Sequence, residues 1–221
     1  MTIISPTDPR LTAKPVYADE EINNPTFELV RFSDSVFSPD SSNELLVIST
    51  YDDVEEKGWV SRWDEALGGV ISKSCKDAKF ASSLGEHLVV DVTDAVGVGG
   101  KKFVLVIGMG SIKNQKSSMS CGLYKFALET AEKVEAESLL LPFFPDRSKL
   151  SALAVNGSIA VLRCRVGESV LRGRIKSLKK IKLVVSGQAT NAALRGLSSR
   201  TEAFCVPCPE PSIVKEEVSS D

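Results

Sequence analysis

The sequence has a single histidine, His87, and this scarcity excludes several classes of catalytic site. A Ser-His-Asp triad or a zinc site with several histidine ligands would have to use that one residue. The Gly-x-Ser-x-Gly elbow of many hydrolases and the Gly-Lys-Ser/Thr ending of a P-loop are also absent. His87 falls in an apolar stretch that predicts a strand, so we interpret it as a structural histidine.

Long hydrophobic runs and an excess of one charge are missing as well. The longest nearly apolar run, Phe103 to Met109, is too short to cross a bilayer, and the first residues lack the apolar segment of a secretory signal. Lys and Arg number 27 against 29 Asp and Glu, so the chain as a whole is not built for nucleic acid or membrane surfaces. The five cysteines follow no framework spacing, which favours reduced thiols and a cytoplasmic location, with an organelle as the alternative.

The sequence does contain enough apolar residues to form the core of one folded domain. Of its 221 residues, 43% are hydrophobic, which is typical of a globular protein. Prolines without apolar periodicity mark both ends of the chain. We therefore predict an extended Pro-rich arm over residues 1–26, one α/β domain over 27–200 and a Pro-rich acidic tail over 201–221.

Apolar periodicity predicts alternating strands and helices between these ends. We expect strands over 28–32, 44–50, 86–92, 102–108, 138–143 and 181–186. We expect helices over 60–71, 123–134, 150–161 and 189–197, with a further helix over 167–178 that two glycines disfavour. The link between residues 92 and 102 is too short for a helical crossover, so that strand pair should be antiparallel. The order predicts a three-layer α/β/α sandwich with a mixed, mostly parallel sheet.

The strand ends carry the candidate ligand site. Gly108 and Gly110 end one strand shortly before a helix, where a phosphate can bind to backbone N–H groups. The third glycine of the dinucleotide pattern is replaced by Lys113, so a plain turn is the alternative. With the polar residues that follow the two strands, the candidate ligand-binding residues are Ser49, Asp52, Gly108, Gly110 and Ser111. We predict no catalytic residue, no metal site and no cofactor.

A basic segment over residues 163–182 is the second candidate surface. The segment contains one acidic residue, Glu168, and eight basic residues: Arg163, Arg165, Arg172, Arg174, Lys176, Lys179, Lys180 and Lys182. The functional interpretation is an acidic partner, and the alternative is a solvated face. The segment lacks the aromatic residues that single-stranded nucleic acid would stack on. A Cys-x-x-Cys at 205–208 has no second ligand pair for zinc, so we interpret it as coincidence or a labile disulfide.

The pattern and order of these segments resemble the N-terminal domain of the leucyl (cytosol) aminopeptidase family. The segments that carry the resemblance are ELLVISTYDD, KKFVLVIGMG, LYKFALETAEKVEAESLLLPF and RIKSLKKIKLVVS followed by ATNAALRGLSS, within about residues 28–198. The resemblance implies a macro-domain-like α/β/α fold. The family's catalytic signature, Asn-Thr-Asp-Ala-Glu-Gly-Arg, is absent, so no metallopeptidase site is implied for any residue.

Three functions remain open at this point. The first is a non-catalytic interaction or assembly module, working in a homo-oligomer or with a protein partner such as a full-length relative. The second is a nucleotide- or ADP-ribose-binding domain of the macro type, using the strand ends. The third is a fragment of a split metallo-aminopeptidase. We expect the first, and we expect neither a membrane span nor nucleic acid as partner.

Overall fold

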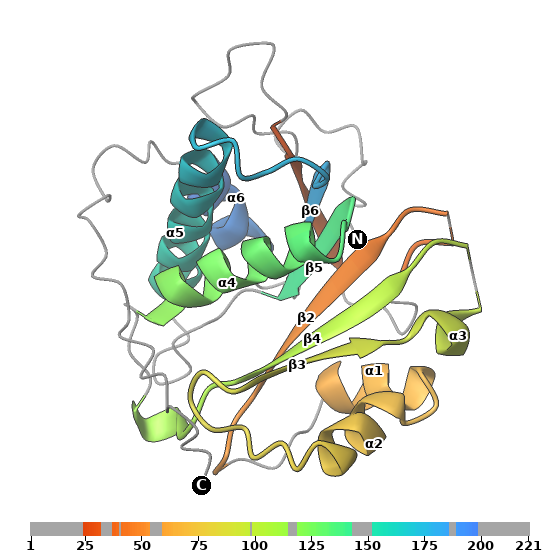
Figure 1. Ribbon diagram of the computed structural model, residues 1–221. Helices are drawn as coiled ribbons and strands as arrows, with labels where there is room; N and C mark the ends of the chain where they lie inside the picture. Colours follow the sequence, from red (N-terminus) through yellow and green to blue (C-terminus); the bar gives the residue numbers. More distant parts are fainter. Residues whose placement is uncertain are drawn as a thin grey trace, which may run out of the picture.

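A six-stranded mixed sheet forms the centre of the molecule (Figure 1). The structure is a computed structural model that describes residues 24–31, 37–39, 41–53, 59–97, 99–114, 119–142, 152–185 and 189–198. The strands are β1 (Thr26–Arg31), β2 (Glu44–Thr50), β3 (His87–Asp91), β4 (Lys102–Gly108), β5 (Ser138–Pro142) and β6 (Lys180–Val185). They lie in the order β1-β6-β5-β2-β4-β3.

Helices follow most of the strands. They are α1 (Trp59–Ala66), α2 (Val70–Asp77), α3 (Thr93–Val96), α4 (Met119–Lys133), α5 (Ala152–Leu171) and α6 (Thr190–Ser198), with a 3-10 turn, η1 (Ile112–Asn114). All neighbouring strands are parallel except β3 and β4, which pair antiparallel. The predicted mixed sheet and its antiparallel pair are therefore confirmed.

Strand β2 shows how the sheet separates two cores. Successive side chains of a strand point to opposite faces, and both sets in β2 are buried. Leu45 and Val47 pack into the core beneath α4, α5 and α6, whereas Leu46 and Ile48 pack with Trp63 of α1 and the apolar side of α2. Helices thus cover both faces, which confirms the three-layer α/β/α sandwich (Figure 1).

The prediction of a single helix over 60–71 is wrong, because the chain forms two helices there. Gly68 and Gly69 have φ values of 68° and 78°, a conformation that ends α1. The carboxylate of Asp64 on α1 then accepts hydrogen bonds from the backbone N–H groups of Ile71 at 2.9 Å and Ser72 at 3.2 Å. These bonds cap the start of α2, so the apolar face continues across a turn that periodicity alone does not reveal.

The two helices predicted over 150–161 and 167–178 are also wrong, because α5 is continuous from Ala152 to Leu171. Gly167 costs the helix about 1 kcal/mol relative to alanine. Burial of Leu162, Val166 and Val170 around it offsets that cost. The helix stops only before Gly173, whose φ is 63°.

Three remaining predictions concern the ends of the chain, the cysteines and membrane spans. The arm and the tail lie outside the described residues, apart from residues 24–26, and so does the Cys-x-x-Cys at 205–208. Cys75 and Cys121 are free thiols, but Cys164 on α5 is disulfide-bonded, so the expectation of reduced thiols is wrong for that residue. None of the described helices combines the length and apolar character that a membrane crossing requires.

Candidate functional site

The predicted ligand residues meet at the carboxyl edge of the sheet. The parallel register of β2 and β4 places Thr50 beside Gly108, so both strands end together. Past these ends the two chains stay bonded, because Met109 N–H donates to the carbonyl of Thr50 at 2.8 Å and Asp52 N–H donates to that of Gly110 at 3.2 Å. The structure therefore brings Ser49, Asp52, Gly108, Gly110 and Ser111 to one edge.

The backbone at the two glycines is already engaged. Gly108 N–H donates to the carbonyl of Glu86 at 2.7 Å, and Gly110 N–H donates to that of Ser82 at 2.9 Å. A Cβ atom on Gly108 would lie 2.2 Å from the carbonyl oxygen of Ser83, so the segment over residues 82–86 lies directly against this strand end. A phosphate at these two N–H groups would have to displace backbone hydrogen bonds.

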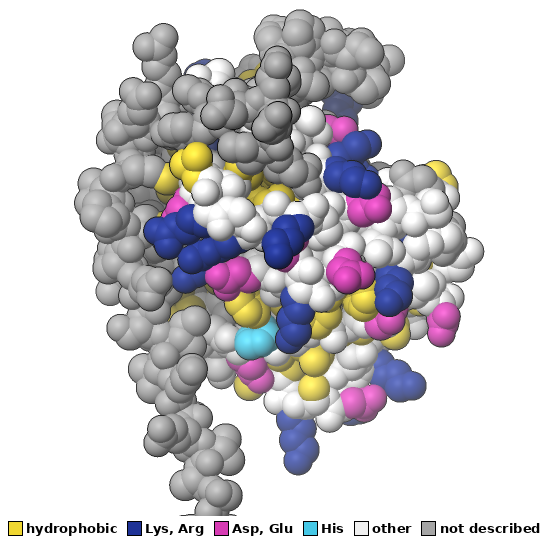
Figure 2. Space-filling view, turned by 45° about the horizontal axis from the view of Figure 1, so that its top comes forward, with side chains coloured by type: hydrophobic (Ala, Val, Ile, Leu, Met, Phe, Trp, Pro, Cys, Tyr) yellow, Lys and Arg dark blue, Asp and Glu magenta, His cyan; other side chains and the backbone are white. Residues whose placement is uncertain are grey.

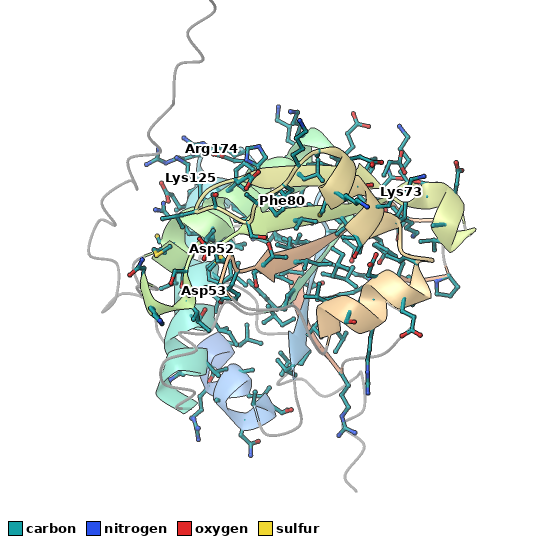
Figure 3. The ribbon with its side chains drawn as sticks, turned by 90° about the horizontal axis from the view of Figure 1, so that it is seen from below. Asp52, Asp53, Lys73, Phe80, Lys125 and Arg174 are labelled. Carbon is teal, nitrogen blue, oxygen red and sulfur yellow. The ribbon has the colours of Figure 1, made fainter. Side chains whose placement is uncertain are left out.

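Asp53 organises the loop beyond the glycines, a role that the sequence analysis did not predict. Its carboxylate accepts from the hydroxyl of Ser111 at 2.5 Å and from Ile112 N–H, the first residue of η1, at 2.9 Å. The Ile112 hydrogen bond, followed by that of Ser111, lowers the pKa of Asp53 below its usual value. Figure 3 shows Asp52 and Asp53 side by side at this edge.

Ser49 and Asp52 differ from their neighbours because their side chains have no hydrogen bond or ion pair within the described part of the chain. Ser49 is half-buried and lies on the same face of β2 as Leu45 and Val47. Asp52 is exposed. One hydroxyl and one carboxylate at the end of the central strand are thus available to a ligand.

The topology predicts a crevice at the same point. The chain leaves β2 toward α1, on one face of the sheet, but leaves β4 and β5 toward α4 and α5, on the other face. Loops that diverge from neighbouring parallel strands leave a crevice between them, and ligands of open α/β sheets bind there. Because β2 lies between β5 and β4, its end is the point of divergence on both sides.

Helix starts add positive potential to this edge. A helix that follows a parallel strand begins near the carboxyl end of that strand, and α4, α5 and α6 follow β4, β5 and β6 (Figure 1). The first turn of each helix carries N–H groups without helical partners and the positive end of the helix dipole. Such ends bind phosphate groups.

The eight predicted cations do not form one open patch. Arg163 is buried at 5% exposure. Five of the others make ion pairs within the chain: Arg165 and Arg172 with Glu168, Lys179 with Glu137, Lys180 with Glu28, and Lys182 with Glu44. Figure 2 shows Lys and Arg side chains interspersed with acidic ones on the face in view. Glu168 lies in the segment itself, whereas Glu28, Glu44 and Glu137 come from parts of the chain that are distant in sequence, and the local sequence does not reveal those three partners.

Side chains that could bind a metal ion are not clustered in the described residues. Within the described ranges, no group of three or more His, Cys, Asp or Glu side chains is arranged to hold a metal ion. Lys113, which stands where a dinucleotide pattern would have glycine, lies in η1 on the loop that Asp53 holds.

Comparison with known proteins finds similarity in structure but not in sequence. No protein-family model and no curated protein sequence matches the chain. A macrodomain from Oceanobacillus iheyensis, solved with ADP, superimposes with a TM-score of 0.59 and 16% identity over 80% of this chain and 92% of that one. The macro domain of ganglioside induced differentiation associated protein 2 gives 0.55 and 13%, covering 75% and 79%.

The predicted resemblance to aminopeptidases is present at the level of fold. A mutant of tomato leucine aminopeptidase superimposes with a TM-score of 0.53 and 13% identity over 83% of this chain, which corresponds to 37% of the tomato enzyme. The macrodomains match over nearly their whole length instead. At these identities the comparisons establish the fold, which is macrodomain-like.

Proposed function

We propose that this chain is a nucleotide-binding domain that takes ADP-ribose or a related adenine nucleotide at the carboxyl edge of its sheet. The observation that carries the proposal is the end of β2, where the loops diverge. There the polar side chains of Ser49 and Asp52 have no partner among the residues that the structure describes. The neighbouring Oceanobacillus iheyensis macrodomain has been solved with ADP and, as a mutant, with ADPR. Those ligands guide the choice of nucleotide.

Each part of the edge has a role in this proposal. A carboxylate accepts hydrogen bonds only, so Asp52 would accept from a ribose hydroxyl or from the adenine amino group. The hydroxyl of Ser49 would donate to or accept from the ligand beside it. The diphosphate would lie toward the helix starts, because their free N–H groups and dipoles favour anions. Gly108, Gly110 and Ser111 would form the wall of the site, since internal hydrogen bonds already engage them.

This proposal replaces the assembly module as the main interpretation. The assembly module was expected from the resemblance to an aminopeptidase domain, and the macrodomain similarity favours the nucleotide-binding alternative. We propose binding without catalysis, as the sequence predicts. The split aminopeptidase gains no support from the comparisons.

Calorimetric titration of the full chain with ADP-ribose, ADP, AMP and adenosine tests the proposal. We expect saturable binding of ADP-ribose that weakens as phosphates are removed. At a ligand concentration of about 100 times Kd, the free energy of unfolding should rise by about 2.7 kcal/mol, visible as a higher Tm. Absence of both heat and Tm shift up to millimolar ligand would exclude the site.

Asp52→Asn locates the binding. A hydrogen bond to a charged group contributes about 1.5–3 kcal/mol, so the affinity should fall by about 10-fold to 100-fold. The matched control is Asp94→Asn, an equally exposed aspartate on α3, which lies near the start of β4 and so at the opposite edge of the sheet. Equal losses in the two variants would place the ligand elsewhere.

A further inference from the structure

Strand β3 forms one edge of the sheet, and its outer side pairs with no strand in the described part of the chain. Gly108 N–H donates to Glu86 at 2.7 Å and Val92 N–H donates to Lys102 at 2.9 Å, with the pairing continuous between these points. Backbone groups of an antiparallel strand alternate in direction. Leu88 and Val90 therefore face β4, whereas the N–H and C=O groups of His87, Val89 and Asp91 point outward.

No other described segment pairs with these outward groups. Native sheets usually protect an edge with lysine, proline or a bulge. The β3 sequence, HLVVD, has neither residue, and its register with β4 is uninterrupted. An open row of backbone donors and acceptors of this kind is a template for another strand.

Apolar side chains accompany the open edge. Val89 is 40% exposed and Leu84, just before the strand, is 62% exposed. The ring of His87 meets that of Phe126 on α4 edge-on, with centroids 4.6 Å apart, so its position beside Val89 is held by packing. Figure 2 shows the histidine at the surface next to hydrophobic side chains.

We propose that a second copy of this chain adds its own β3 to this edge, antiparallel, about a two-fold axis at Val89. In that register Val89 faces Val89 of the second copy, and His87 faces Asp91. All three are outward residues, so each pair exchanges both of its backbone hydrogen bonds. A shift of one residue would oppose outward to inward groups, and a shift of two would lose the pairs at one end. The two sheets would continue as one across the dimer.

Hydrogen-bond complementarity favours a second copy over an unrelated strand. The same register places the imidazole of each His87 opposite the carboxylate of each Asp91, on one face, twice per dimer. Hydrogen bonds from the hydroxyl and the N–H of Thr93 lower the pKa of Asp91, so its carboxylate is charged at neutral pH. Lys101 also attracts this carboxylate. A hydrogen bond from the imidazole N–H of His87 to this charged carboxylate would stabilise the antiparallel pair.

Sedimentation of the full chain tests the proposal, and it does so without reference to any nucleotide. We expect a concentration-dependent dimer of twice 23.8 kDa. Val89→Pro removes an N–H that makes no bond to β4, so it should weaken dimerisation at least tenfold and leave the circular dichroism spectrum unchanged. Val89→Thr, which keeps the N–H, is the control and should still dimerise. A wild-type monomer at about 100 μM, or a dimer indifferent to Val89→Pro, would overturn the proposal.

A pair of charge variants tests the register itself. His87→Asp places two carboxylates opposite each other and should be monomeric. Asp91→Lys removes the carboxylate that faces His87 and should weaken dimerisation. Mixed in equal amounts, the two variants should form a heterodimer, because Asp at 87 then faces Lys at 91. If the mixture stays monomeric while the wild type dimerises, the proposed register is wrong.

Discussion

At the scale of single residues, two adjacent carboxylates at the end of β2 have different roles because they have different hydrogen-bond partners. Asp53 turns back into the protein and holds Ser111 and Ile112, whereas Asp52 has no internal partner in the described part of the chain. The sequence analysis selected Asp52 alone as a ligand residue. Nothing in the local sequence distinguishes them, because the partners of Asp53 come from the loop after β4.

Asp53→Asn should make the protein less dependent on pH. The pKa of Asp53 is lowered in the folded state. Its carboxylate therefore contributes fully to stability at pH values above the pKa that it has in the unfolded chain, about 4. That contribution is lost as pH falls through the lowered folded value. The Tm difference between wild type and variant should therefore be constant near neutral pH and disappear in acid. A difference that persists in acid would show that the carboxylate charge is not the cause.

Gly108→Ala should destabilise the fold by about 1–3 kcal/mol, because its Cβ would lie 2.2 Å from backbone at Ser83. Urea unfolding measures the change. Gly157→Ala on α5 is the opposite control, because a Cβ there meets nothing within 4 Å. Alanine at 157 should stabilise the helix by up to about 1 kcal/mol. Equal effects at both positions would contradict the close approach at Gly108.

At the scale of elements, the carboxyl ends of helices depended on contacts from other elements. The chain after α5 was predicted to be helical to residue 178, yet it leaves the helix at Leu171. Glu132, near the end of α4, accepts hydrogen bonds from the N–H groups of Lys176 and Ser177 at 2.9 and 3.1 Å and of Leu178 at 3.0 Å. This one carboxylate replaces the helical partners of that segment and holds it against α4.

Glu132→Ala should therefore cost about 1–3 kcal/mol, because it leaves N–H groups near the fully buried Leu178 without a partner. Glu129 lies one turn earlier on the same helix and is exposed, so Glu129→Ala should change stability by less than about 0.5 kcal/mol. Hydrogen exchange at residues 176–178 should accelerate only in the first variant. Unchanged exchange there would exclude the capping role.

At the scale of the whole molecule, a buried ionic network joins three strands of the sheet. The carboxylate of Glu44 on β2 contacts the ammonium groups of Lys102 on β4 at 3.1 Å and Lys182 on β6 at 2.7 Å. Ser38 N–H donates to the same carboxylate at 2.7 Å. Glu44 and Lys102 are completely buried, so their charges depend on one another. Two residues that the sequence predicts at the surface thus have core roles: Lys182 here and Arg163 in α5.

Glu44→Ala should cost about 3–5 kcal/mol, because it leaves the buried ammonium charge of Lys102 without the carboxylate of Glu44. That is a large part of the stability of a domain, which is about 5–15 kcal/mol. Glu28→Ala removes the exposed pair with Lys180 at 3.8 Å and should cost less than about 1 kcal/mol. Chemical denaturation of both variants compares them. A small loss in Glu44→Ala would indicate that Lys102 finds another partner.

The sequence by itself determined the strands, the mixed and mostly parallel character of the sheet and its antiparallel pair, because short apolar runs and a link of nine residues permit few alternatives. It also selected the edge at which Ser49, Asp52, Gly108, Gly110 and Ser111 meet. Only the tertiary structure decided which polar groups there are engaged, where α1 and α5 end, and which cations are paired. Several of those outcomes depend on partners from other elements, such as Glu132 for the segment after α5 and Glu44 for Lys182, and local periodicity carries no information about such partners.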